Sequence, residues 1–497
     1  MVYKKFPLSF DDGAFFSFLK KIIFGYAHSM NQTFKPETKV YCLGIGGIGL
    51  SSVAQWMKEL GCVVTGSDRG VSEVTKMLEA KGVTVKIEEM ARSVPDDTEI
   101  VVYSDALPYE HPARVFAREK GIREINYAKC LGLLTESYRC IAVAGSHGKS
   151  TTTALIAHIL TEAGLDPTVV VGTKVPTLGN VNFRFGKSDI VVVEADEFRS
   201  HFLELSPAVA IINNVDHDHV DVFPTIESYV DAFNKFVGKI KQGGELILRE
   251  SDKYSAGFME LRNDVKISTF DLATGGIRVE PLSGSTLIVD FQKYDNGRQY
   301  FSVTRDGVSL GEFNVAFPGE HMLLDAVAGI SAVIPFIDNV EKIRSAMATF
   351  RGTWRRFELL GKYKSATVIS DYAHHPTELR ALLSGARQAY PNKKITIVFQ
   401  PHQSSRTQAF GADFIDALSL ADEVLLVDVF SVAGRDNPKD FVSDRDWVEV
   451  LKQRGKEAYF AEDLIVAEKM LRETEPTDEV LLFVGAGSID QLARKLI

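Results

Sequence analysis

Several features that define other classes of protein are missing from this sequence. Its 497 residues include only four cysteines and no CxxC pair, which argues against a disulfide framework or a cysteine zinc site and indicates reduced thiols in a cytoplasmic protein. The net charge of −10 lacks the basic excess that a nucleic-acid partner would require. No apolar run reaches the roughly 18 residues that a membrane span needs, so we expect no stable membrane insertion.

The first 36 residues are apolar in places, but Lys20 and Lys21 interrupt the apolar stretch. The segment therefore lacks the unbroken apolar core of a signal peptide, which runs for about 7–15 residues. We interpret residues 1–36 as an extension that packs on the protein, with a weak membrane or partner contact as the alternative.

The rest of the chain alternates buried strands with helical patterns, which predicts α/β domains with parallel sheets. Its length suggests about three domains. We expect a Rossmann-like domain at 37–137, a central P-loop ATPase-like domain at 138–350 and a second Rossmann-like domain at 351–497. In the last of these, four buried strands are predicted at 367–370, 395–398, 424–427 and 480–484. Residues 245–315 show short alternating strands with predicted turns at Gly275–Gly276, Ser283–Gly284 and Asp295–Gly297, from which we expect a small antiparallel excursion inside the central domain.

A glycine motif opens the first of these domains. Gly44–Gly49 has the sequence GIGGIG between a predicted strand and a predicted helix, and Asp68 follows the next strand. This order is typical of sites that hold a diphosphate against a helix N-terminus, with the acid on a ribose hydroxyl. The motif leaves open whether the ligand is NAD or a nucleotide sugar, and a tight packing turn is the structural alternative.

A second glycine loop lies at the start of the central domain. Gly145–Thr151 has the sequence GSHGKST and also joins a strand to a helix, although Val143 occupies the place of the first glycine of the full P-loop pattern. Glycines let backbone N–H groups turn toward phosphate oxygens, Lys149 can reach the β- and γ-phosphates, and Ser150 can bind Mg²⁺. The loop predicts a triphosphate site, against the alternative of an ordinary strand–turn–helix.

Polar clusters follow two later buried strands. Glu194, Asp196 and Glu197 end one strand, and Asn214–His219 ends the next. Strand ends of an open α/β sheet lie beside the phosphate loop, and carboxylates there suit Mg²⁺. The histidine in the second cluster would suggest zinc on composition alone, and a solvated acidic turn is the structural alternative.

These motifs occur in an order that resembles the Mur ligases of bacterial cell-wall synthesis over residues 38–497. Further segments that carry the resemblance are Arg355–Glu358 (RRFE), Asp371–Glu378 (DYAHHPTE), Phe399–His402 (FQPH), Ser405–Thr407 (SRT) and Val484–Gly487 (VGAG). The resemblance implies an ATP-dependent ligase that uses Mg²⁺, activates the carboxylate of UDP-N-acetylmuramate as an acyl phosphate and joins it to an amino acid, expected to be L-alanine.

The resemblance also implies roles for individual residues. UDP-substrate contacts are expected from Gly44, Gly46, Gly47, Ile48, Gly49, Ser67, Asp68 and Ser104. ATP contacts are expected from Gly145, Ser146, His147, Gly148, Lys149, Ser150, Thr151, His321, Arg356 and Asp371. The metal ligands would be Ser150, Glu194 and His219. The resemblance thus implies Mg²⁺ at His219 in place of the zinc that composition alone would suggest. The amino-acid and muramyl end would meet Tyr372, His374, His375 and Arg406. The expected catalytic residues are Lys149, Glu194, His219, Arg356 and His374.

Five positions depart from the family pattern. Met322 and Asp325 replace asparagines near the adenine site, and Arg199, Gln403 and Ser404 lie in segments near the reacting end. The last three keep open a ligase that adds a different amino acid or a preformed peptide. More remote alternatives are an NAD-dependent oxidoreductase and a non-catalytic nucleotide-binding scaffold. We expect a monomer or weak homodimer.

Overall fold

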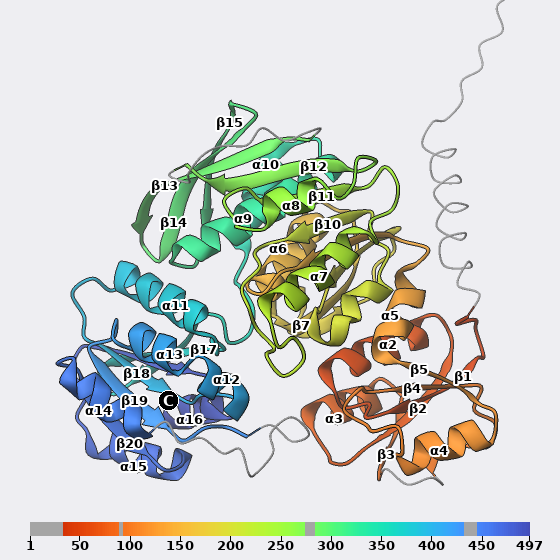
Figure 1. The fold of residues 1–497 in the computed structure, drawn as a ribbon, viewed down its shortest axis with the longest axis horizontal. Helices are drawn as coiled ribbons and strands as arrows, with labels where there is room; N and C mark the ends of the chain where they lie inside the picture. Colours follow the sequence, from red (N-terminus) through yellow and green to blue (C-terminus); the bar gives the residue numbers. More distant parts are fainter. Residues whose placement is uncertain (1–32, 89–92, 274–283, 432–444) are drawn as a thin grey trace, which may run out of the picture. The chain divides into compact units, whose positions relative to one another are not determined.

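The computed structural model describes residues 33–88, 93–273, 284–431 and 445–497 (Figure 1). Most of the N-terminal extension lies outside this part of the chain, so its expected packing stays a prediction. The described chain forms two compact units. One takes in the residues up to Cys140 together with Asp166–Val170 and Phe183–Val191, and the other takes in the remainder.

The first unit contains a five-stranded parallel sheet in the order β3-β2-β1-β4-β5. Its elements are β1 (Lys39–Leu43), α2 (Ile48–Glu59), β2 (Val63–Asp68), α3 (Glu73–Ala80), β3 (Thr84–Ile87), β4 (Ile100–Tyr103), α4 (Pro112–Glu119), β5 (Arg123–Asn126) and α5 (Tyr127–Thr135). The strand order reverses between β1 and β4, and in open α/β sheets such a reversal is where ligands bind. Gly44 and Ser104 follow these two strands directly.

The central sheet has ten strands in the order β15-β14-β13-β12-β11-β10-β6-β9-β7-β8. Its strands are β6 (Arg139–Ala144), β7 (Thr168–Val175), β8 (Val181–Arg184), β9 (Ile190–Glu194), β10 (Val209–Ile212), β11 (Glu245–Arg249), β12 (Lys266–Leu272), β13 (Thr286–Asp295), β14 (Arg298–Arg305) and β15 (Val308–Val315). The helices are α6 (Lys149–Glu162), α7 (Ile226–Val237), α8 (Ser255–Met259), α9 (Glu320–Val333) and α10 (Val340–Thr349).

The extent predicted for the antiparallel excursion was wrong. β11 and β12 pair in parallel with the strands beside them, and β13 joins β12 in parallel as well. Only the pairs β13–β14 and β14–β15 are antiparallel. The helices α7 and α8 explain the difference, because each carries the chain back to start the next strand in the same direction.

The turn predicted at Asp295–Gly297 is confirmed. Asn296 and Gly297 have positive φ, 48° and 75°, and they join β13, which ends at Asp295, directly to β14. This is the backbone that a two-residue hairpin needs to match the strand twist, and asparagine and glycine adopt it most readily. The turn predicted at Gly275–Gly276, and Ser283 of the one predicted at 283–284, lie outside the described residues.

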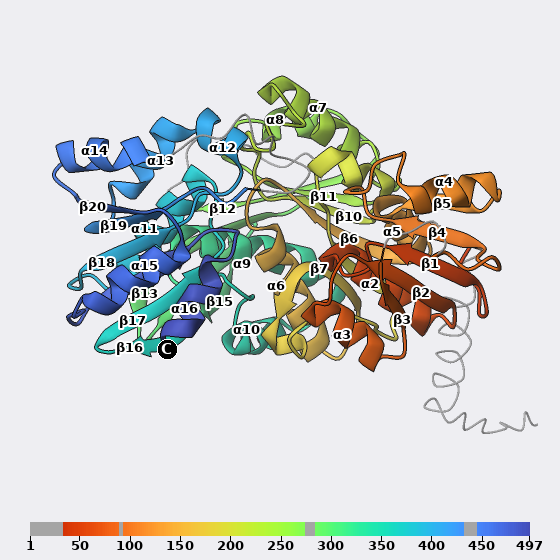
Figure 2. The same cartoon turned by 90° about the horizontal axis from the view of Figure 1, so that it is seen from below.

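The third sheet has the order β16-β17-β21-β18-β19-β20. Its elements are β16 (Glu358–Tyr363), β17 (Ala366–Asp371), α11 (Pro376–Ala389), β18 (Ile395–Phe399), α12 (Ser404–Ala409), α13 (Gly411–Leu418), β19 (Glu423–Val427), α14 (Arg445–Gln453), β20 (Glu457–Ala461), α15 (Leu464–Glu473), β21 (Val480–Val484) and α16 (Ile489–Leu496). Two apolar cores lie on its opposite faces, and Figure 2 shows α13 and α14 on one side with α15 and α16 on the other.

The α/β fold class of the three segments is therefore confirmed. All four cysteines are buried free thiols. Among the described residues, no helix combines the length and the apolar character that crossing a membrane requires.

Candidate active site

The phosphate loop connects the end of β6 to the start of α6. Gly145 and Gly148 have φ of 130° and 80°, a region that L-residues with a side chain rarely adopt. A Cβ on Gly145 would approach the backbone N of Asn213 to 3.0 Å, and one on Gly148 would overlap the carboxylate of Asp325. The two glycines are required by both conformation and space, which is the property expected of a loop that curls around phosphate.

Lys149 begins α6, and its ammonium is held inside the loop. Nζ donates to the carbonyl oxygens of Gly145 and Ser146 at 2.6 and 3.1 Å, and to Oε1 of Glu197 at 2.9 Å. Burial lowers the pKa of Lys149, but Glu197, Asp196 and Glu194 outweigh burial and raise it. The lysine is therefore a firmly charged group beside the loop, with Glu197 as its counter-ion.

Ser150 and Glu194 are brought together by the structure. Ser150 Oγ donates to Glu194 Oε1 at 2.9 Å, and Glu194 Oε2 accepts the backbone N–H of Gly172 at 2.6 Å. Burial raises the pKa of Glu194, against the opposing effects of Gly172, Lys149 and Ser150. A hydroxyl and a partly buried carboxylate at the helix start form a hard-oxygen donor set of the kind that suits Mg²⁺.

His219 lies in the neighbouring acidic group. Its Nε2 is 3.6 Å from Glu197 Oε1, and Asp196, Glu197 and His219 each offer a ligand atom within 4.8 Å of the others. Oε2 of Glu197 and Nδ1 of His219 are buried with no hydrogen-bond partner in the described structure. These unsatisfied atoms next to Lys149 also fit a bound cation, because buried polar groups otherwise have partners.

A cavity of about 340 Å³ opens beside the phosphate loop. Its walls include residues from the loop, from the ends of β10 and β11, from α9 and from the third domain. The lining includes residues that could contact a nucleotide: His147, Gly148, Thr151, Asn213, Asn214, Asp216, Arg249, Asp252, His321, Met322, Asp325, Arg356, Asp371 and Glu378. The third domain thus closes one side of the cavity.

Arg356 projects into this cavity beside α11. Its Nη1 lies 3.1 Å from Glu378 Oε1, and Glu378 also accepts the backbone N–H of His374 at 3.0 Å. Asp371 accepts backbone N–H groups of Phe357 and Ala373, each at 2.7 Å, which shapes the turn that carries the arginine. Burial lowers the pKa of Arg356, but Glu378 and Asp371 outweigh it, so the guanidinium stays charged.

The two histidines at the start of α11 are held neutral. Burial lowers the pKa of His374 to about 3 and that of His375 to about 4. His374 Nδ1 lies 3.0 Å from the carbonyl oxygen of Tyr372, whereas His375 caps α11 and accepts the N–H of Thr377 at 3.3 Å. A neutral imidazole can donate one hydrogen bond and accept another through its two ring nitrogens, which suits a group that orients a polar substrate.

Arg406 is paired with an acid of the central domain. Its Nε and Nη2 donate to Asp218 Oδ1 at 3.0 and 2.7 Å, and both side chains are almost fully buried. Burial raises the pKa of Asp218, but Arg406 and the nearby histidines hold it well below its usual range. Gln403, one of the departures from the family pattern, precedes this arginine at the start of α12 with a φ of 73°.

Two other departures lie in the cavity wall. Met322 lines the cavity, and Asp325 faces Gly148 with Oδ1 3.4 Å from Nδ2 of Asn213. Burial raises the pKa of Asp325 to about 7, against the effects of Thr152, Arg356 and His147. Nearby, burial lowers the pKa of His321 to about 4. An acid that is half protonated near neutral pH thus borders the phosphate loop.

The glycine motif of the first unit forms a tight turn between β1 and α2. Gly44 has a φ of 78°, Ser67 accepts the N–H groups of Gly44 and Ile45 through its carbonyl, and Asp68 Oδ2 accepts the N–H of Gly46 at 2.8 Å. A Cβ on Gly49 would come within 2.9 Å of the Tyr127 ring. Asp68, which is expected to contact a ribose, thus also stabilises the turn itself. The helix α2 begins at Ile48, and no side chain caps its N-terminus.

Some residues of the site were not assigned from the sequence. Asp216, Glu197 and Glu378 belong to segments that the motifs included, but their part in the cavity and the ion pairs depends on contacts across the fold. Arg249 and Asp252 carried no motif. The one available signal was their position at the end of a buried strand, and that signal was lost when residues 245–315 were all interpreted as antiparallel.

Three family models match successive parts of the chain. The Mur ligase family, catalytic domain model matches residues 39–139, the Mur ligase middle domain model matches 143–333, and the Mur ligase, glutamate ligase domain model matches 355–487.

Curated relatives match along nearly their full length. A UDP-N-acetylmuramate–L-alanine ligase of Caldanaerobacter subterraneus subsp. tengcongensis is 35% identical over 92% of this chain and 97% of its own. The enzyme of the same name from Aquifex aeolicus is 34% identical over 92% and 97%.

Solved structures agree with this pattern. UDP-N-acetylmuramate-alanine ligase from Thermotoga maritima has a TM-score of 0.76 and 30% identity over 92% of this chain and 98% of its own. A murein peptide ligase from Psychrobacter arcticus has a TM-score of 0.66 and 21% identity over 92% and 98%, which is a likeness of fold alone.

Proposed function

The chain belongs to the Mur ligase family, and on that basis we propose that it joins L-alanine to the carboxylate of UDP-N-acetylmuramate with ATP, in the synthesis of peptidoglycan precursors. The observation that carries this proposal is the 35% identity to an L-alanine-adding ligase over 92% of the chain. An ATP-dependent ligase also explains why residues of the phosphate loop and Arg356 of the third domain line one cavity.

The reaction requires a poor electrophile to be activated. The substrate carboxylate takes the γ-phosphoryl group of ATP, and the amine then attacks the acyl phosphate and expels inorganic phosphate. Lys149 and Arg356 are the cations placed to offset charge during phosphoryl transfer, which depends mainly on positioning and electrostatic stabilisation. The neutral His374 and the paired Arg406 are candidates for orienting the amino acid and the muramyl carboxylate.

Mg²⁺ belongs to this proposal. Ser150 and Glu194 would hold it at the start of α6, with His219 as the further ligand from the adjacent acidic group. When bound, the ion would neutralise phosphate charge. The loop does not depend on the ion for its conformation, because Gly145 and Gly148 already adopt the positive φ values that the turn requires.

We divide these tasks among three domains. Residues 37–137 would bind the UDP part through the glycine turn and Asp68, 138–350 would bind ATP, and 351–497 would bind the amino acid. The four free thiols and the nucleotide substrates support a cytoplasmic location. A monomer or weak homodimer, with no nucleic-acid partner, remains our expectation.

A substrate panel tests the proposal. Purified protein is supplied with ATP, Mg²⁺ and UDP-N-acetylmuramate, and phosphate release is measured with L-alanine, glycine, L-serine or a preformed tripeptide. We expect the highest kcat/KM with L-alanine, and we expect no phosphate release when the UDP-sugar is left out. Turnover with the tripeptide alone would replace our assignment by a peptide-adding ligase. Lys149→Ala is the matched negative control.

A further inference from the structure

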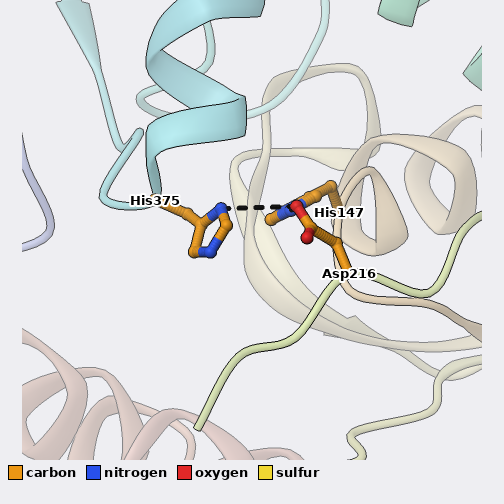
Figure 3. A group of neighbouring side chains, drawn as sticks. All are labelled: His147, Asp216 and His375. Carbon is orange, nitrogen blue, oxygen red and sulfur yellow. Dashed lines mark hydrogen bonds and ion pairs between the residues drawn. The ribbon is translucent and has the colours of Figure 1, made fainter. Parts of the chain in front are cut away.

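Two histidines and one carboxylate form a group beside the phosphate loop (Figure 3), and two of the three residues, His147 and Asp216, also line the cavity described above. His147 comes from the phosphate loop, Asp216 follows β10, and His375 caps α11. His147 Nε2 lies 3.0 Å from Asp216 Oδ2, and His375 Nδ1 lies 3.5 Å from the same oxygen. One ligand atom from each of the three side chains lies within 4.8 Å of the other two.

These separations match the spacing of ligands around a small tetrahedral ion. Bonds of about 2.0–2.2 Å from zinc to histidine nitrogen and carboxylate oxygen place neighbouring ligand atoms roughly 3.3–3.5 Å apart. The distance of 3.0 Å lies below this range, and the distance of 3.5 Å lies at its upper end. An ion among the three side chains would require the first pair to open slightly and the two histidine nitrogens, which lie within 4.8 Å of each other, to take up the same spacing.

The protonation of His375 favours such an ion. Its side chain is only 4% exposed, and its Nδ1 accepts the N–H of Thr377 at 3.3 Å and lies 3.5 Å from Asp216, so an ion would take the lone pair that Thr377 now uses. Its Nε2 is buried without a partner in the described structure. Metal binding needs a neutral imidazole, and His375 is already neutral because burial lowers its pKa to about 4.

His147 has the outer partner that metal-bound histidines usually show. While Nε2 faces Asp216, Nδ1 lies 3.6 Å from Oε1 of the buried Glu378. A carboxylate in this position orients the ring and strengthens the other nitrogen as a ligand. Burial lowers the pKa of His147, but Asp216 and Glu378 outweigh burial and raise it to about 9, so an ion at this ring must displace a proton.

We propose that His147, Asp216 and His375 form a site for a transition-metal ion of the zinc class, separate from the oxygen-rich site at Ser150 and Glu194. Two imidazole nitrogens with one carboxylate favour Zn²⁺, Co²⁺ or Ni²⁺ over Mg²⁺. Three protein ligands leave a fourth position for water. Since the ion ties the phosphate loop to the start of α11, it slows nucleotide exchange and inhibits the ligase; this last consequence rests on the proposed function.

Metal binding by the full chain tests the site without any substrate. Metal-free protein in excess Mg²⁺ is titrated with Zn²⁺ by calorimetry and with Co²⁺ by visible absorption. We expect one ion per chain and the spectrum of tetrahedral Co²⁺. Asp216→Asn and His375→Gln should each weaken Zn²⁺ binding by at least about tenfold, since even outer-partner changes cost that much.

Two control variants locate the ion. His217→Gln changes the neighbouring histidine, whose Nε2 lies 2.8 Å from the carbonyl oxygen of Phe223, and should leave Zn²⁺ affinity unchanged. His219→Gln alters the other acidic group and should also retain binding. Absence of Zn²⁺ binding, unchanged affinity in both Asp216→Asn and His375→Gln, or loss in His219→Gln alone would overturn the site and leave a metal-free charge network.

Two further measurements keep the outcomes distinct. If the ligand variants do not fold, anomalous scattering at the zinc edge from wild-type crystals decides the matter, since a peak away from the three side chains overturns the proposal. In the ligase assay, Zn²⁺ should lower kcat at saturating Mg²⁺. Bound Zn²⁺ without inhibition would refute only the functional consequence, and an inactive ligase that still binds Zn²⁺ would refute only the proposed function.

Discussion

The ammonium of Lys149 lies 2.9 Å from Oε1 of Glu197; the Glu197 side chain is buried and that of Lys149 is 14% exposed. The lysine at the heart of the phosphate loop thus has a counter-ion before any nucleotide arrives. Glu197 in turn accepts a hydrogen bond from the hydroxyl of Tyr229 at 3.2 Å. Phosphate oxygens must share or replace this partner, so the pair links the stability of the fold to the chemistry of the site.

Lys149→Ala should separate these two roles. We expect kcat to fall by at least about 10²-fold, the usual effect of removing one charge-stabilising donor. Thermal unfolding should also shift down, because Glu197 is left buried without its partner, a loss of about 3–5 kcal/mol. Adding Glu197→Gln should recover much of the stability but none of the activity. Recovery of turnover in the double variant would contradict the assigned role of Lys149.

Asp325 should make the stability of the protein depend on pH. In the unfolded chain this carboxyl has its ordinary pKa of 3.8, whereas burial in the folded protein raises its pKa to about 7. Between these values the folded state binds more protons, so stability falls as pH rises, by up to about 4 kcal/mol at 1.36 kcal/mol per pH unit. Asp325→Asn should remove this contribution.

Differential scanning fluorimetry at pH 5 to 8 measures this effect. The Tm advantage of Asp325→Asn over the wild type should grow as pH rises, and the variant should bind ATP more tightly above pH 7 because no carboxylate repels the phosphates. Asp290→Asn, at an exposed acid of β13, is the matched control. A constant Tm difference across the pH range would show that Asp325 is not the titrating group.

The pair of Arg406 and Asp218 should contribute strongly to folding. Arg406→Ala leaves a buried carboxylate unpaired and should destabilise the protein by about 3–5 kcal/mol near neutral pH. The pKa of Asp218 is depressed in the folded protein, so its contribution is present above about pH 4 and is lost as pH falls. The deficit of the variant, followed by Tm, should therefore shrink toward acid pH. A deficit independent of pH would indicate lost packing instead.

Asp68 should affect only the UDP-substrate. Its carboxylate accepts the N–H of Gly46 and so stabilises the glycine turn after β1. Asp68→Ala should raise the KM for UDP-N-acetylmuramate by about tenfold, the equivalent of one hydrogen bond to a charged group, and leave the KM for ATP unchanged. Glu79→Gln, at an exposed acid of α3, serves as the control. Equal effects on both substrates would place Asp68 outside the UDP site.

Local patterns predicted much of this fold. The strands at β17, β18, β19 and β21 are apolar runs bounded by polar residues, and each is buried as expected. β16 and β20 were missed because they are edge strands with exposed residues among the buried ones, so neither shows a continuous apolar run. The direction of β11 and β12 was mistaken for a similar reason, since pairing direction depends on the helices that return the chain.

The residues of the sequence by themselves determined the two glycine turns and the place of Lys149 at a helix start, because positive φ and a helix start are properties of a few adjacent residues. Only the tertiary structure decided which charges are paired. Glu197 meets Lys149 from 48 residues away, Asp218 meets Arg406 from 188 away, and His375 reaches Asp216 from another domain. Such pairings require burial and strand order to bring distant side chains together, and no local pattern encodes either.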